Sequence, residues 1–144
     1  MKSFDLTGRT AVITGGGTGL GEAIAKGMAE AGASIVLCGR RMEMLEQVAS
    51  VIRATGAKVL PVKTDVSRKD EVDAMAARAL AEFGRVDVLV NNAGINIVRP
   101  FLKLQEEEWD AVLNTNLKGC YYCCQAMGRG MVEQRSGSII NMVS

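Results

Sequence analysis

Short apolar runs alternate along the chain with longer segments in which apolar residues recur every three or four positions. The short runs have the length and composition of strands, and they cover 9–14, 34–38, 58–62, 86–90 and 138–142. The longer segments have helical spacing, and they cover 20–31, 42–52, 72–83 and 106–133. Strands that alternate with helices and are apolar throughout predict an α/β fold, in which right-handed crossovers build a parallel sheet covered on both faces.

The third predicted helix carries a sequence signature at its start. Ser67 is followed three residues later by Asp70, a spacing that resembles a capping box, and the apolar face that follows runs from Val72 through Leu80 to Phe83. We therefore expect Ser67 to cap this helix and Leu80 to be buried.

The overall composition is that of one globular domain, residues 1–144. Of these residues 48% are hydrophobic and 23% are charged, which is enough apolar material for a core. The formal net charge is +1 and long charged runs are absent, so nothing indicates binding to nucleic acid or to a membrane surface. No stretch has the length of a membrane-spanning helix and the N-terminus lacks an apolar targeting segment, so we expect a soluble, cytoplasmic protein.

Cysteine and histidine usage excludes several chemistries. The chain has no histidine, which excludes a Ser-His-Asp triad and a histidine-ligated zinc site. Cys120 and Cys123 have redox or metal-binding spacing, but they lie inside an apolar helical pattern, which favours buried packing thiols. The three acids Glu106–Glu108 are best explained as complementing a helix N-terminus. We expect no metal site.

The glycine-rich stretch Thr14–Gly21 lies where the first strand turns into the first helix. Glycines allow positive φ and close approach of a ligand to the backbone, and the free N–H groups of a helix N-terminus favour an anion. The spacing G-x-x-x-G-x-G differs from the G-x-G-x-x-G fingerprint, and Glu22 stands where a P-loop needs lysine. The stretch therefore predicts a phosphate cradle without ATP hydrolysis; the alternative is a flexible turn without a ligand.

Polar residues follow the ends of the second, third and fourth predicted strands. Arg40, Asp65 and Asn92 occupy these positions, and the carboxyl ends of parallel strands share one edge of the sheet. An acid after the second strand would favour NAD, whereas here Gly39 is followed by Arg40 and Arg41. A guanidinium suits a 2′-phosphate, so NADP is favoured over NAD, unless both arginines are only solvated residues at a helix start.

These motifs together resemble the short-chain dehydrogenase/reductase family, over the whole chain. They are T-G-x-x-x-G-x-G at Thr14–Gly21, Asp65-Val66, and Asn91–Gly94 after the fourth strand. The resemblance implies a Rossmann-type doubly wound parallel sheet, here truncated after the fifth strand. It also implies hydride transfer between a nicotinamide cofactor and a small-molecule alcohol or ketone. It implies a cofactor site with Gly15, Gly17, Thr18, Gly19 and Leu20 at the pyrophosphate, Arg40 at the 2′-phosphate, Asp65 and Val66 at the adenine, and Asn92, Ala93 and Gly94 on the nicotinamide side.

The same resemblance implies catalytic residues. The family uses a tyrosine as acid/base, a nearby lysine, a serine that binds the substrate oxygen and an asparagine that positions the lysine through water. Asn116 matches the asparagine and Ser144 matches the serine, but neither Tyr121 nor Tyr122 has a lysine four residues later. Because a general acid/base contributes roughly 10²- to 10⁴-fold, we expect this chain alone to be inactive.

Other interpretations remain open at this point. The opening residues are similar to those of sugar-acid dehydrogenases and 3-oxoacyl carrier-protein reductases of the family, and the resemblance implies a homo-oligomer through the helix from Glu106. One alternative is a stand-alone dinucleotide-binding module or pseudoenzyme. A second is a methyltransferase-like fold with an adenosyl cofactor, which would need an acid where Arg40 and Arg41 stand.

Overall fold

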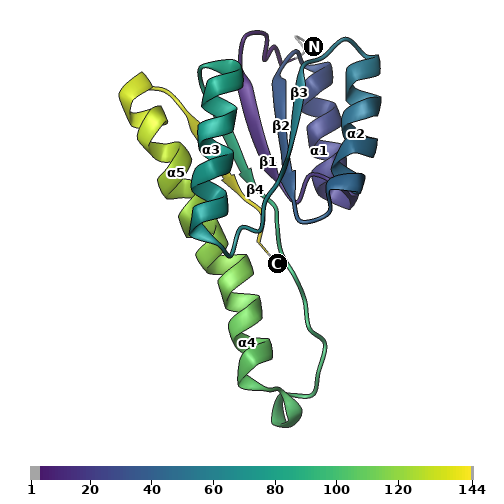
Figure 1. Ribbon diagram of the computed structural model, residues 1–144, viewed down its shortest axis with the longest axis vertical. Coiled ribbons are helices and arrows are strands. Elements are labelled where there is room, and N and C mark those ends of the chain that lie inside the picture. Colours follow the sequence, from purple (N-terminus) through teal and green to yellow (C-terminus); the bar gives the residue numbers. More distant parts are fainter. Residues whose placement is uncertain (1–3, 144) are drawn as a thin grey trace.

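Helices cover both faces of one parallel sheet in the computed structural model, which describes residues 4–143 (Figure 1). In chain order the elements are β1 Thr10–Thr14, α1 Gly19–Glu30, β2 Ser34–Gly39, α2 Met42–Ala54, β3 Val59–Lys63, α3 Lys69–Phe83, β4 Val88–Asn91, the 3₁₀ turn η1 Phe101–Lys103, α4 Glu106–Leu113, the π-helical turn η2 Asn114–Lys118, α5 Gly119–Gln134 and β5 Ser138–Asn141. The predicted order of strands and helices is confirmed.

The strands pair in the order β3-β2-β1-β4-β5, and every pair is parallel. Ile13 of β1 lies between Leu37 of β2 and Val90 of β4. The chain builds the sheet outward from β1 to β3 and then returns to add β4 on the other side of β1. The carboxyl ends of β1 and β4 therefore diverge at a switch point, where folds of this kind bind ligands.

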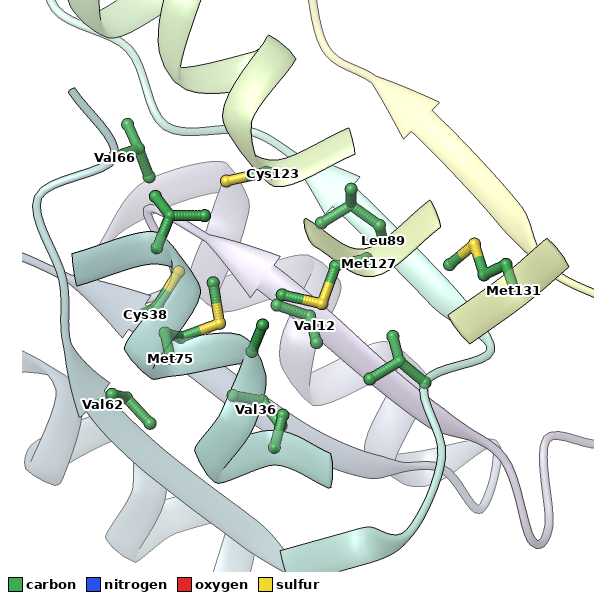
Figure 2. Close-up of a cluster of buried hydrophobic side chains, with 14 residues drawn as sticks. Val12, Val36, Cys38, Val62, Val66, Met75, Leu89, Cys123, Met127 and Met131 are labelled. Atoms are coloured by element: carbon green, nitrogen blue, oxygen red, sulfur yellow. The ribbon is translucent and has the colours of Figure 1, made fainter. Parts of the chain in front are cut away.

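Side chains of β1 alternate between two cores. Ala11 and Ile13 join a cluster with α1 and α2, whereas Val12 joins a second cluster with α3 and α5. Figure 2 shows the second cluster, in which Met75 of α3 and Met127 of α5 lie near Val12. Both clusters are buried, which explains why the strands are apolar on both sides.

The start of α3 differs from the prediction. No capping box forms at Ser67 and Asp70, because the Ser67 hydroxyl donates to Asp65 Oδ1 at 2.7 Å and the helix begins one residue later, after Arg68. A short polar side chain that bonds to its own turn competes with its use as a helix cap. Leu80, expected in the core, is 43% exposed.

The four cysteines differ in burial, whereas packing thiols were expected to be buried. Cys38 and Cys123 are fully buried, and burial raises the pKa of Cys123 to about 12. Cys120 and Cys124 lie on the same helix but are only partly buried, so the expectation is wrong for Cys120. Cys120 Sγ donates to Asn141 Oδ1 of β5 at 3.4 Å, and Cys124 Sγ accepts from Asn91 Nδ2 of β4 at 3.3 Å.

The amphipathic region predicted over 106–133 is interrupted by a π-helical turn. α4 and α5 are joined by η2, so the helix continues with one wider turn at Asn114–Lys118. Such turns inside α-helices are frequent at functional sites. Here the turn carries Asn116.

Strand β5 forms an open edge of the sheet in the described part of the chain. Ile139 and Ile140 of this strand are about two-fifths exposed. An uncovered apolar edge strand offers unpaired backbone groups to another strand. Within residues 4–143, none of the helices combines the length and apolar character needed to cross a membrane.

A buried carboxylate ties the amino ends of β1 and β4 together. Asp87 accepts hydrogen bonds from the Thr10 amide at 2.9 Å, from Arg9 at 3.0 Å and from Arg85. Burial by itself raises the pKa of Asp87, but the bonds from Arg85, the Thr10 amide and Arg9 outweigh it and lower the pKa. The carboxylate therefore stabilises the fold in its charged form.

Replacing Asp87 by asparagine is expected to lower the free energy of unfolding by about 1–3 kcal/mol at pH 7, because the buried Thr10 amide and the partly exposed Arg9 and Arg85 lose a charged acceptor. A lowered folded-state pKa means that the wild-type advantage is complete above the unfolded pKa of about 4 and disappears as the pH falls through the folded-state value. Urea unfolding between pH 3 and 7 measures this. Asp73→Asn, an exposed control at a carboxylate that pairs with Lys69, should change stability little. A stability difference between wild type and Asp87→Asn that is independent of pH would contradict the assignment.

Candidate nucleotide-binding site

One pocket lies beyond the carboxyl ends of β1, β2, β3 and β4. It brings together residues that are far apart in the sequence but follow neighbouring strands, as the rim of a parallel sheet requires. The predicted site residues that line it are Gly15, Gly17, Thr18, Arg40, Asp65, Val66, Ala93 and Gly94. Three further predicted residues, Gly19, Leu20 and Asn92, lie next to the pocket in sequence but do not line it.

The glycine turn has the backbone geometry that a phosphate cradle needs. Gly15 and Gly19 have φ values of +65° and +56°, in the left-handed region that favours glycine. α1 begins at Gly19, and the Thr18 side chain makes no capping hydrogen bond to it. The Thr18 side chain therefore does not compete for the first N–H groups of α1, which together with the helix dipole favour an anion.

Asn92 holds this turn from behind. Its side-chain Nδ2 donates to the carbonyl oxygens of Thr14 at 3.1 Å and Gly15 at 3.3 Å. The backbone amides of Asn92 and Ala93 both donate to Thr14 Oγ1 at 2.9 Å. Asn92 thus fixes the position of the glycine turn relative to β4, rather than facing the pocket as the resemblance implied.

The end of β2 contributes the positive charge. Gly39, Arg40 and Arg41 all line the pocket, and both arginines are exposed. Among residues 4–143, neither guanidinium takes part in an ion pair. Their hydrogen-bond donors are therefore available to an anionic ligand.

The π-helical turn is bound to the loop after β4. Asn116 Oδ1 accepts from the Ile95 amide at 2.8 Å, and Asn116 Nδ2 donates to the Ile95 carbonyl at 2.9 Å. A Cβ atom on Gly94 would lie 3.4 Å from Asn116 Oδ1. Asn116 therefore holds the segment Gly94–Ile95 at the pocket. Ser144, the predicted catalytic serine, lies outside the described residues.

A second cavity adjoins the first and shares Val66 and Ala93 with it. Asn116, Cys120 and Asn141 line this second cavity, which lies between the π-helical turn and the end of β5. The predicted catalytic residue Asn116 is thus found beside the predicted cofactor residues, on the side where the nicotinamide was expected.

Sequence reasoning missed several residues of the first pocket. Thr64 directly follows β3, and its amide donates to the carbonyl of Gly39 of β2 at 2.8 Å. Ile95 follows the Asn91–Gly94 motif, and Thr115 precedes Asn116 on the π-helical turn. Adjacency to a motif was the only available signal for these residues, because none has a distinctive side chain for phosphate or nucleotide binding.

Comparison with known proteins places these features in a family. The family profile described as short chain dehydrogenase matches residues 9–144. The chain is 42% identical to an uncharacterized oxidoreductase of Staphylococcus aureus strain USA300 over 139 residues, which are 96% of this chain and 59% of that protein. It is also 42% identical to the 3-oxoacyl-[acyl-carrier-protein] reductase of Chlamydia trachomatis serovar D, over 96% of this chain and 56% of that protein.

A solved structure has the same fold. A metagenomic short-chain oxidoreductase crystallised in complex with NADP superimposes with a TM-score of 0.92 at 39% identity, covering 96% of this chain and 63% of the other. The chain therefore spans less than two thirds of the length of each of these relatives.

Replacing Gly21 by alanine is expected to disrupt the turn. A Cβ there would clash with the Gly15 carbonyl oxygen and lie 2.6 Å from Asn92 Nδ2. Because neither group can retreat without breaking the Asn92 bonds, we expect a loss of roughly 1–3 kcal/mol in the free energy of unfolding. Gly27→Ala, on the same helix with open space around it, is the matched control and should stabilise by about 0.5–1 kcal/mol. Equal effects of the two substitutions in urea unfolding would rule out this packing role.

Proposed function

We propose, from the premise that this chain belongs to the short-chain dehydrogenase family, that it binds NADP in the rim pocket. It would then form the cofactor-binding part of an oxidoreductase that transfers hydride between the nicotinamide and a small-molecule alcohol or ketone. The observation that carries the proposal is the convergence of the Gly15 turn, Arg40, Asp65 and Ala93 on one pocket. That pocket therefore offers a phosphate cradle, a positive end and a polar wall to one extended ligand.

The chemistry of the β2 end supports NADP over NAD. A carboxylate at the end of β2 would repel a 2′-phosphate, but this position holds Gly39 and Arg40 instead. The guanidinium groups of Arg40 and Arg41 offer hydrogen-bond donors to a 2′-phosphate. The NADP in the related metagenomic oxidoreductase agrees with a nicotinamide cofactor here. A methyltransferase-like adenosyl cofactor is disfavoured by the same arginines.

These 144 residues would supply some of the catalytic groups but not the tyrosine and lysine pair. Asn116 beside the second cavity suits a positioning role, and Ser144 matches the serine that binds the substrate oxygen. No tyrosine here has a lysine four residues later, so these 144 residues alone would turn over slowly or not at all. A stand-alone dinucleotide-binding module is the alternative with the same pocket and no turnover.

The proposal extends to a homo-oligomer through α4 and α5. Trp109, Leu113, Leu117 and Tyr121 recur every four residues along α4, η2 and α5, and each is between 39% and 67% exposed. An apolar stripe of this kind on a helix is usually covered by a partner surface. Sedimentation velocity is expected to show a dimer or larger species; a monomer at micromolar concentration would refute this part.

The central test is nucleotide binding by the purified chain. NADP is expected to bind with the lowest Kd in calorimetry and to raise the melting temperature more than NAD or S-adenosylmethionine, since ligands that bind only the folded state stabilise it. Stronger protection by S-adenosylmethionine would overturn the assignment.

Three variants at the end of β2 test the choice between NADP and NAD. Arg40→Asp is expected to shift preference from NADP toward NAD, because it exchanges a donor for a like charge beside the 2′-phosphate. Gly39→Asp should do the same, whereas Gly39→Asn, with a neutral side chain of the same shape, should weaken NADP binding less. Unchanged NADP affinity in Arg40→Asp would remove the proposed role of this residue.

A further inference from the structure

The turn between β3 and α3 forms one wall of the pocket, and an acidic side chain on α3 holds it. Thr64, Asp65 and Val66 line the pocket. Glu71, the third residue of α3, reaches back beyond the start of its helix, and its Oε2 accepts a hydrogen bond from the Asp65 amide at 2.7 Å. The backbone of the wall is thereby attached to the helix behind it.

Several other polar groups of this turn are engaged as well. Asp65 Oδ1 accepts from the Ser67 amide at 3.0 Å and from the Ser67 hydroxyl at 2.7 Å. The second carboxylate oxygen of Glu71 pairs with Arg68 Nε at 3.0 Å. Glu71 itself does not line the pocket, so any effect on a ligand must pass through Asp65.

We infer that Glu71 is a positioning residue for the nucleotide: by binding the Asp65 amide it holds the Thr64–Val66 wall in the shape that receives the adenosine end of the cofactor. The inference rests on the proposed function. A turn without this bond populates several conformations. The apparent affinity then falls in proportion to the fraction of molecules whose turn is competent to bind. This role requires a side-chain oxygen at position 71 that can accept a hydrogen bond from the Asp65 amide, and the negative charge is secondary.

Three variants separate reach from charge. Glu71→Asp keeps the charge but is one methylene too short for the 2.7 Å bond, whereas Glu71→Gln keeps an acceptor at the same reach without the charge. Asp73→Asn, an exposed carboxylate on the same helix, is the control. Calorimetry with NADP and with 2′,5′-ADP, which contains only the adenosine end, compares their Kd values.

Glu71→Asp is expected to raise the Kd of NADP and of 2′,5′-ADP by the same factor, about fivefold or more. Glu71→Gln and Asp73→Asn should stay within about twofold of wild type. The preference for NADP over NAD should not change in any of them. In the absence of nucleotide, hydrogen exchange of the Asp65 amide should accelerate in Glu71→Asp and not in Glu71→Gln.

Two results would overturn the inference while leaving the proposed function intact. One is wild-type NADP affinity in a folded Glu71→Asp variant, and the other is an equal loss in Glu71→Gln and Glu71→Asp. If Glu71→Asp does not fold, the test rests on Glu71→Gln. A Glu71→Gln variant whose Asp65 amide stays protected from hydrogen exchange but whose NADP binding is weakened would overturn the inference. A wild-type chain that binds no dinucleotide would overturn both.

Discussion

Thr14 and Asn92, 78 positions apart in the chain, each bind the other's backbone through their side chains, where β1 and β4 end side by side. Thr14 Oγ1 accepts two backbone amides from the β4 end and donates to the Val90 carbonyl at 3.3 Å. At the opposite end of the same strand pair, Asp87 binds the Thr10 amide. Closing so long a loop costs chain entropy, and these buried polar contacts at both ends offset it. The pairing they secure also creates the switch point at which the pocket opens.

Close approach of backbone to backbone is a second consequence of that pairing. The β1–α1 turn packs so tightly against Asn92 that Gly21 has no room for a side chain, and Gly15 adopts a left-handed conformation. Gly15 and Gly17 of the same turn line the pocket with backbone alone. Close packing against Asn92 behind the turn and an open lining on the pocket side therefore both depend on glycine at these positions.

The residues around the pocket fall into two physical groups. Arg40 and Asp65 line it directly, whereas Asn92, Glu71 and Asn116 lie behind the lining and hold backbone segments in place. Each of these three binds main-chain groups of a segment that faces the ligand space. Membership of a sequence motif does not distinguish the two groups, since Asn92 and Ala93 are neighbours in one motif and differ in this respect. The distinction matters for mutagenesis, because substitutions in the second group first change the backbone segments that these side chains hold.

The sequence by itself determined the alternation of strands and helices, the parallel sheet with two covered faces, and the rim on which Gly15, Arg40, Asp65 and Ala93 meet. These follow from periodicity and strand polarity, which are local properties that need no knowledge of distant contacts. Only the tertiary structure decided that Asn92 turns toward Gly15, that Glu71 rather than Ser67 organises the start of α3, that Leu80 is exposed, and that the long helix widens at Asn116. Each of these depends on which polar group or packing partner lies closest in space. For Asn92 that partner is 77 or 78 positions away, and for Asn116 it is 21, so no local pattern could identify it.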